Sequence, residues 1–461
     1  MTRYSLTARR LFAAVAVLLL AAVLGAKTPA ARPDPLKVAL EKAAFRPPSR
    51  LKGTSIQIAE LDSGSIVYEK NPKQPEVLAS VTKMLSTAAA LHELGPDYKF
   101  KTTFWCSGEV KDGLLQGSLL VVGGGDPNIS GRFYNDDFNA VFDRWADGLK
   151  QAGIVSVSGD LIVNASFFDG VGRHPDWKNG QENKWYQAPT SALSYNDNVV
   201  YVSIGPGERP GRPAAITIEP ESGLFRTVSQ ARTSGMKGRV RVAVKRDVGS
   251  DAIEVYGIVP FRPLNWTTPI AVDDPPAFFG NTLRKRIEAA GIQILGGLVR
   301  QDVKPDAFWT LVAETESDLV PTLAVTNKRS QGFYAEQVFK TLAAEKAGQG
   351  SWQTAVDLQR RFFVKLGLDP SHFEIRDGSG LSQQNRVPAA DMVAFLRAMS
   401  ASPVGPVWRT TLATAGEGGS TLQHRLRDEA LAGRVQAKTG SINSVSTLAG
   451  YATANSGRTY V

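Results

Sequence analysis

The sequence predicts a mixed α/β (α+β) protein in which one discontinuous domain, built from both ends of the chain, carries a strand-rich insertion. Its 461 residues correspond to roughly three folded units. Strand and helix patterns alternate over residues 36–99 and 318–461, whereas residues 100–317 show mostly short strands and turns and fit about two small domains. With 43% hydrophobic and 21% charged residues the chain is typical of globular proteins, which excludes disordered, fibrous and polytopic membrane classes.

The N-terminus has the pattern of an export signal. Arg3, Arg9 and Arg10 precede an unbroken apolar run, Leu11–Leu24, and small residues follow. This pattern predicts a secretory signal peptide over residues 1–30. The run is shorter than the roughly 18–20 residues that span a bilayer, so a permanent anchor is the less favoured alternative. We therefore expect a periplasmic or other extracytoplasmic location, where the net charge of +9 does not indicate nucleic acid as a partner.

The first folded elements are predicted to be a hairpin and a helix. Two alternating runs, Thr54–Glu60 and Ser65–Glu69, flank a turn at Gly64 and predict the hairpin. Apolar residues at helical spacing then predict a helix from about Ser80 to Glu93, ended by Gly95.

The rest of the chain is predicted to change from strands to helices and back. The strand-rich insertion contains one clear helix at about Pro276–Ala290, and further helices are expected at Val325–Ala344 and Ala389–Met399. Strands with Gly and Asn turns are predicted over Gly433–Val461. Because Cys106 is the one cysteine, no intramolecular disulfide can form.

One stretch of the insertion is strongly basic. Between Arg209 and Arg246 there are nine basic and two acidic residues, and Arg239, Arg241 and Lys245 alternate with valines. The pattern is typical of a solvated strand face. The functional alternative is contact with anionic cell-wall polymer or, peripherally, with a membrane surface.

The sequence favours a serine nucleophile activated by lysine. It has four histidines, no Gly-x-Ser-x-Gly motif and no Cys/His cluster, so neither a Ser-His-Asp triad nor a zinc site is indicated. A lysine three residues after a serine lies on the same helix face and can act as its base. Ser80 opens the predicted amphipathic helix, where a serine can also be a plain cap. The pattern occurs at Ser49/Lys52, Ser80/Lys83 and Ser234/Lys237.

A second motif lies near the C-terminus. Lys438, Thr439 and Gly440 form the one Lys-Thr-Gly triplet in the chain, followed by Ser441. On an edge strand these residues offer an ammonium and a hydroxyl to a substrate carboxylate, and the glycine lets the ligand backbone approach closely. Together with Ser-x-x-Lys, this motif is typical of penicillin-binding proteins and class A β-lactamases.

With both ends placed, the chain resembles the class C penicillin-binding proteins, the serine D-alanyl-D-alanine carboxypeptidase/endopeptidase family, from about Thr54 to its end. The 250 residues between Ser80 and Ser330 fit the inserted domains of that family and not a class A β-lactamase. The resemblance implies a penicilloyl-serine-transferase fold, with an antiparallel sheet built from both chain ends. It is carried by Ala79–Lys83, Gly123–Pro127, Ser191–Asn198, Tyr334–Glu336, Asp377–Ser382 and Ala437–Gly440.

The resemblance also implies a role for each site residue. Ser80 would attack the carbonyl of a terminal D-Ala-D-Ala bond or of a crosslink in a peptidoglycan stem peptide, and β-lactams would acylate the same serine. Lys83 would be the base, with its neutral form favoured by burial and by the positive charge of Lys438. No metal or organic cofactor is implied. Ser330 would relay a proton to the leaving amine, Lys438, Thr439 and Gly440 would bind the substrate, and the N–H groups of Ser80 and Ser441 would form the oxyanion hole.

The middle motif departs from the family pattern. The family has Ser-x-Asn before Tyr-Ala-Glu, but here Ser330 is followed by Gln331 and Gly332. A missing amide would weaken the positioning of the catalytic lysine. This leaves a catalytically impaired, peptidoglycan-binding relative as an alternative, and a β-lactamase as a less favoured one. Literal Ser-x-Asn strings at Ser194 and at Ser441 are weaker candidates for the motif.

The C-terminal sequence stops early relative to the family pattern. A strand over Val445–Thr453 is followed by a turn and by Arg458–Val461, which would begin another strand. We expect a truncated chain whose last four residues pair with Thr54–Glu60. Without a covering helix, an apolar patch is expected near Ile56 and Ile58.

Overall fold

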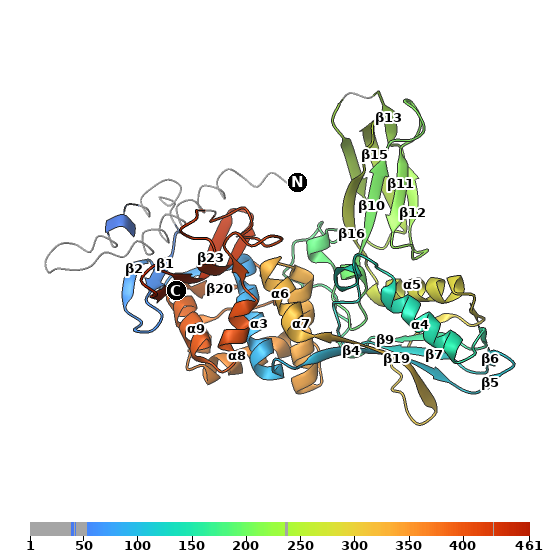
Figure 1. Ribbon diagram of the computed structural model, residues 1–461, viewed down its shortest axis with the longest axis horizontal. Helices are drawn as coiled ribbons and strands as arrows, with labels where there is room; N and C mark the ends of the chain where they lie inside the picture. Colours follow the sequence, from blue (N-terminus) through green and yellow to red (C-terminus); the bar gives the residue numbers. More distant parts are fainter. Residues whose placement is uncertain (1–37, 41, 43–52, 236–237, 427) are drawn as a thin grey trace. The chain divides into compact units, whose positions relative to one another are not determined.

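A computed structural model of the chain describes residues 38–40, 42, 53–235, 238–426 and 428–461 (Figure 1). The predicted signal peptide lies outside these residues. Within them, no helix combines the length and apolar character needed to cross a membrane. The chain divides into two compact units: the first comprises the chain up to Tyr98 together with Asp318–Val461, and the second is Lys99–Ser317.

The first unit contains a four-stranded sheet and a hairpin from the two chain ends. The hairpin is β1 (Ile56–Ala59) with β2 (Ile66–Lys70), as predicted. Glu60 bridges Tyr460, and Ala59 and Val461 exchange two backbone hydrogen bonds of 3.0 and 2.9 Å, so the last residues pair with the first strand as expected. The sheet has the order β21 (Ala413–Thr414), β22 (Val435–Ile442), β23 (Val445–Thr453) and β24 (Thr459–Tyr460).

The expected apolar patch beside the hairpin is only partly present. Ile58 is buried, so the prediction of its exposure is wrong, because α9 (Ala389–Ala401) packs against β1. Ile66 of β2 is 56% exposed.

Helices of the first unit surround α3, which is almost entirely buried and contacts α6, α7 and α8. A 3₁₀ turn (Ala79–Val81) leads into α3, and Gly95 ends the helix with a positive φ of 88°. Two short strands, β3 (Pro75–Val77) and β20 (Arg386–Pro388), form a separate pair. The helices are α3 (Thr82–Leu94), α6 (Leu319–Lys328), α7 (Gly332–Ala347), α8 (Trp352–Lys365), α9 and α10 (Gly405–Thr410).

The prediction of a single helix over Val325–Ala344 is wrong. Ser330 has a φ of 59°, a left-handed conformation that a right-handed helix cannot include, so α6 ends at Lys328 and α7 begins at Gly332. This break places the Ser330 side chain in a turn between two buried helices.

The second unit contains a five-stranded sheet with two helices. Its core includes Phe104, Phe142, Trp145 and Phe279, whose rings pack together. The helices are α4 (Ala140–Gln151) and α5 (Pro275–Ala289), the latter close to its predicted position. The sheet order is β18 (Leu298–Arg300), β9 (Leu161–Asn164), β7 (Leu119–Val122), β4 (Lys99–Ser107) and β19 (Trp309–Asp318).

The remaining strands of the second unit form three smaller sheets. One has the order β17 (Gln293–Ile294), β8 (Ser156–Val157), β6 (Leu114–Leu115) and β5 (Val110–Lys111). Another is β11 (Ala215–Glu219), β10 (Val199–Gly205) and β16 (Trp266–Ala271). In the third, β15 (Ala252–Pro260) is paired by β12 (Arg226–Ser229), β13 (Arg232–Ser234) and β14 (Arg241–Lys245).

Candidate active site

Ser80 and Lys83 lie within hydrogen-bond distance of each other. The Lys83 ammonium donates to Ser80 Oγ at 3.0 Å and to the carbonyl oxygen of Ser379 at 2.6 Å. Ser80 occupies the 3₁₀ turn before α3, and Ala79 before it has a φ of 47°. Such left-handed residues persist only where the surroundings hold them, so the turn that presents Ser80 is fixed by its neighbours.

Three segments hold the Ser80 turn. A Cβ at Gly380 would lie 1.9 Å from the carbonyl oxygen of Ala79, and a Cβ at Gly440 would lie 3.0 Å from the backbone nitrogen of Ser80. Thr447 of β23 donates a 2.7 Å hydrogen bond to the carbonyl oxygen of Leu78. The glycines at 380 and 440 are therefore required by close backbone approach, and β22 runs directly beside Ser80.

Burial changes the acid–base properties of Lys83. The side chain is 2% exposed, and burial lowers its pKa from 10.5 to about 8, while the nearby carboxylates of Glu336 and Asp377 oppose the change. At pH 7 this leaves roughly one tenth of the amine neutral, far more than an ordinary lysine would have. The expected contribution of the Lys438 charge is not among the causes of this shift. Burial, together with the charges of Lys83 and Arg425, lowers the pKa of Lys438 well below its usual value.

Ser330 contacts the lysine of the Lys-Thr-Gly strand. The fully buried Lys438 ammonium donates to Ser330 Oγ at 2.7 Å and to the carbonyl oxygen of Thr439 at 2.7 Å. Thr439 is buried beside it, whereas Ser441 is exposed. The left-handed turn between α6 and α7 is what directs the Ser330 hydroxyl toward β22.

Ser194, the alternative motif serine, lies in the second unit. Its hydroxyl donates to the carbonyl oxygen of Ser191 at 2.9 Å and accepts from Asn198 Nδ2 at 3.0 Å. These bonds belong to a buried turn in which Asn196, Asp197 and Asn198 all have positive φ. Ser330, and not Ser194, therefore contacts Lys438. In the part of the chain that the structure describes, no group of acidic, histidine and cysteine side chains could hold a metal ion.

Residues 36–461 match the model of the D-Ala-D-Ala carboxypeptidase 3 (S13) family. The chain belongs to this family. It is 29% identical over 418 residues to the D-alanyl-D-alanine carboxypeptidase of Actinomadura sp. (strain R39), covering 86% of this chain and 74% of that protein. The predicted family and its reaction class, a serine-type D-Ala-D-Ala carboxypeptidase, are confirmed.

Solved structures confirm the predicted fold class. Penicillin binding protein 4 (dacB) from Haemophilus influenzae superposes with a TM-score of 0.76 and 23% identity, covering 89% of this chain and 90% of that chain. The same protein in complex with a β-lactam superposes with a TM-score of 0.72, also at 23% identity, over 89% and 90% of the two chains.

A buried pair of carboxylates supports the lysine of this S13 protein. Glu336 Oε1 accepts from Ser379 N at 2.7 Å, and Glu336 Oε2 accepts from Gly378 N at 2.9 Å and Trp352 Nε1 at 2.7 Å. Glu336 thus anchors the loop that contains Ser379, whose carbonyl oxygen accepts the hydrogen bond from Lys83. Burial and the charge of Asp377 raise the pKa of Glu336 to about 7, although its N–H donors favour the charged form.

Asp377 anchors the other half of that loop. Its Oδ1 accepts from Gly380 N at 2.7 Å and Asn385 Nδ2 at 2.6 Å, and its Oδ2 accepts from Ser382 N at 2.7 Å. The segments of Glu336 and Asp377 were expected only as family markers, and this anchoring role was not predicted. Both carboxylates act through bonds to loop backbone that is distant in sequence from Glu336, so local sequence patterns carried no signal for this role.

Gly332, the departure from the family motif, is the first residue of α7 and is buried. Lys83 nevertheless has two oxygen partners, Ser80 Oγ and the Ser379 carbonyl. A backbone carbonyl therefore orients the amine without an amide side chain at position 332. One turn further along α3, Asn327 Nδ2 donates to Thr87 Oγ1 at 3.1 Å, and this hydroxyl donates to the carbonyl oxygen of Lys83 at 2.7 Å.

Proposed function

We propose that the chain removes the terminal D-alanine of peptidoglycan stem peptides through an acyl-enzyme on Ser80. The observation that carries this is the hydrogen bond from Lys83 Nζ to Ser80 Oγ. Neutral Lys83 takes the Ser80 proton as Oγ bonds to the carbonyl carbon, and the N–H groups of Ser80 and Ser441 face the developing oxyanion.

Release of the leaving amine uses the second hydrogen-bonded pair, Ser330 and Lys438. As the C–N bond breaks, the leaving amine receives a proton relayed through Ser330, while Lys438 and Thr439 hold the substrate carboxylate. Water then attacks the ester, giving its proton to Lys83, and the carbonyl–Oγ bond breaks as Oγ regains a proton. The S13 membership and the Ser330–Lys438 hydrogen bond support these roles.

We propose the same serine as the site of acylation by β-lactams, since the superposable Haemophilus influenzae protein was solved with a β-lactam. We further propose that the protein acts outside the cytoplasm, where stem peptides are assembled into the wall. The apolar run Leu11–Leu24 supports export.

Gly332 favours a second candidate function, a peptidoglycan-binding relative with impaired catalysis. Labelling with fluorescent penicillin, together with D-alanine release from a soluble peptide ending in D-Ala-D-Ala, separates the two. A stable adduct and D-alanine release that are both lost in Ser80→Ala support the peptidase. No adduct supports the impaired relative, and rapid release of hydrolysed penicillin identifies a β-lactamase.

A further inference from the structure

Arginines cluster at one end of the outermost sheet of the second unit. β13 and β14 lie on opposite sides of β15, and the register places Arg232 and Arg241 both opposite Ile258. At the usual strand spacing their Cα atoms are about 10 Å apart on one face. Other exposed arginines lie in the adjoining loops. We call the following six residues the arginine cluster: Arg209, Arg212, Arg232, Arg239, Arg241 and Arg262.

The loops are tied to these strands by backbone hydrogen bonds. Thr233 N donates to the carbonyl oxygen of Arg212, and Gly211 N donates to that of Thr233, both at 2.8 Å. Arg262 stands two residues after β15, and Arg239 stands two residues before β14. The six arginines therefore lie at one end of the sheet around β15 or in loops that adjoin that end.

No acid neutralises this cluster. Among the residues that the structure describes, none of the six arginines forms an ion pair, and Arg232 donates only to the carbonyl oxygen of Gly211, at 3.4 Å. Cations further along the same face are paired, Arg226 with Asp251 at 3.0 Å and Lys245 with Asp247 at 3.1 Å. Because a merely solvated face usually mixes both signs, the unpaired end indicates an anionic partner.

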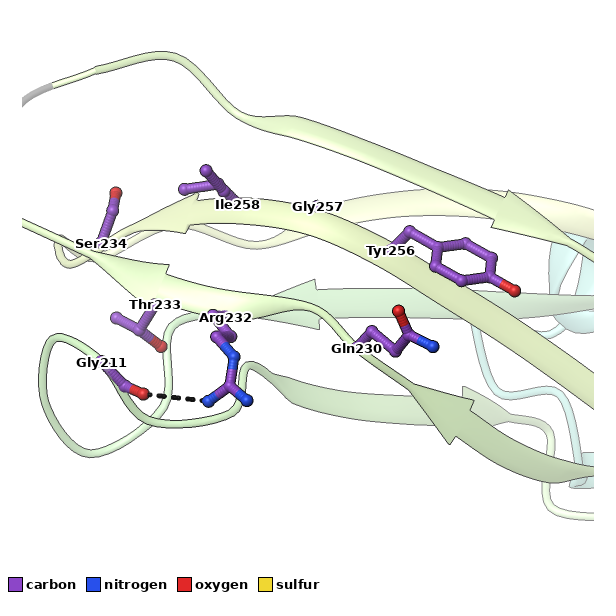
Figure 2. Close-up of a pocket in the computed structure, with 8 residues that line it drawn as sticks. All are labelled: Gly211, Gln230, Arg232, Thr233, Ser234, Tyr256, Gly257 and Ile258. Carbon is purple, nitrogen blue, oxygen red and sulfur yellow. Dashed lines mark hydrogen bonds between the residues drawn. The ribbon is translucent and has the colours of Figure 1, made fainter.

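A groove runs beside the cluster. It is an open cavity of about 370 Å³ between β13 and β15. Figure 2 shows Tyr256 and Gln230 at one end of the groove, Gly211 and Ser234 at the other, and Arg232 between them. Ile258 on its wall is 48% exposed. An aromatic ring, an amide and a guanidinium around an apolar floor suit a ligand that combines sugar rings with carboxylates.

We propose that the arginine cluster and this groove bind strands of the peptidoglycan polymer through the free carboxylates of its stem peptides. The proposal rests on the proposed substrate, whose peptides each end in a carboxylate. A polymer that repeats such groups can contact several arginines at once and keep the enzyme near further cleavage sites. A membrane surface fits less well, since Ile258 is the one large apolar side chain of the groove lining and a single such anchor buries little area in a bilayer.

The test compares two double variants that each remove two positive charges from the same sheet face. Arg232→Gln/Arg241→Gln removes unpaired cations, and Arg226→Gln/Lys245→Gln removes paired ones. Co-sedimentation with purified insoluble peptidoglycan, at about 50 and 500 mM salt, measures binding. Penicillin acylation and D-alanine release from a soluble peptide measure the active site. Vesicles of phosphatidylcholine and phosphatidylglycerol are the membrane probe.

We expect the first variant to bind peptidoglycan on the order of tenfold more weakly at low salt, with acylation and soluble-peptide turnover unchanged. The control variant should bind within about twofold of the parent. Equal losses in both variants, undiminished binding in the first, or loss of vesicle binding alone would overturn the proposal. Failure of acylation and of soluble-peptide turnover in the parent would instead overturn the proposed function.

Discussion

Replacing Gly440 by alanine tests whether close packing between β22 and the Ser80 turn sets the reaction geometry. An added Cβ would lie 2.1 Å from Thr447 Oγ1, 2.7 Å from the carbonyl oxygen of Leu78 and 3.0 Å from Ser80 N. The Thr447 side chain can rotate away, at the cost of its hydrogen bond to Leu78. The Leu78 carbonyl is backbone and cannot yield without moving the turn.

The size of the effect follows from the Leu78 contact. Ordinary contacts begin at 3.4 Å, so the turn must retreat by 3.4 minus 2.7, or about 0.7 Å. A misplacement of about 1 Å costs on the order of 100-fold in rate, so we expect acylation of Gly440→Ala to fall roughly 30-fold. Overpacking should also lower the free energy of unfolding by about 1–3 kcal/mol.

The assay is the second-order rate of acylation by fluorescent penicillin, paired with urea unfolding. Gly418→Ala is the matched control, because a Cβ at Gly418 meets no atom within 4 Å. In the double variant Gly440→Ala/Thr447→Ala we expect part of the stability to return but not the acylation rate, since the Leu78 overlap remains. An acylation rate for Gly440→Ala within about threefold of the parent would refute this reasoning.

Three further predictions concern Lys83 and its neighbours. Because burial lowers the pKa of Lys83 to about 8 and the neutral amine is the active form, the acylation rate should rise with pH and level off above about pH 9; a pH-independent rate between 6 and 9 would contradict Lys83 as the base. Glu336→Gln removes a negative charge that raises the pKa of Lys83, so the inflection of the acylation–pH profile should move to lower pH; an unmoved inflection would count against this effect of Glu336 on Lys83. Weaker acceptors for the N–H groups of Gly378 and Ser379 should also reduce the unfolding free energy, measured by urea titration, by about 2 kcal/mol. Gly332→Asn should raise acylation about fivefold, because a restored amide would add to the orientation that the Ser379 carbonyl gives Lys83, and an unchanged rate would show that this carbonyl has replaced the amide.

Local patterns predicted the elements that carry the motifs. The hairpin, the helix after Ser80 and the C-terminal strands follow from period-2 and period-3.6 spacing, and Gly95 marks the helix end. The helix α8 was missed although Ser351 caps it and accepts a hydrogen bond from Thr354 N. That cap and the amphipathic pattern after it were readable from the sequence.

The break between α6 and α7 at Ser330 could not be predicted from local sequence patterns. Half of α6 and all of the first thirteen residues of α7 are buried, so neither helix presents the polar stripe by which periodicity separates one helix from the next. The left-handed φ of Ser330 is stabilised by its place between the helices and by Lys438, which is 108 residues away. Such a constraint is tertiary and leaves no local signal.

The site contacts also indicate how the first unit folds. Lys83 reaches Ser379 across 296 residues, and Thr447 reaches Leu78 across 369. Bringing such distant segments together costs loop-closure entropy that only the completed packing around α3 offsets. The left-handed Ala79 needs surroundings that hold it, and the segments of Gly380 and Gly440 pack directly against this turn, so we expect a partly folded chain to present Ser80 without its geometry. Penicillin acylation therefore reports on the folding of the whole first unit as well as on the chemistry of one serine.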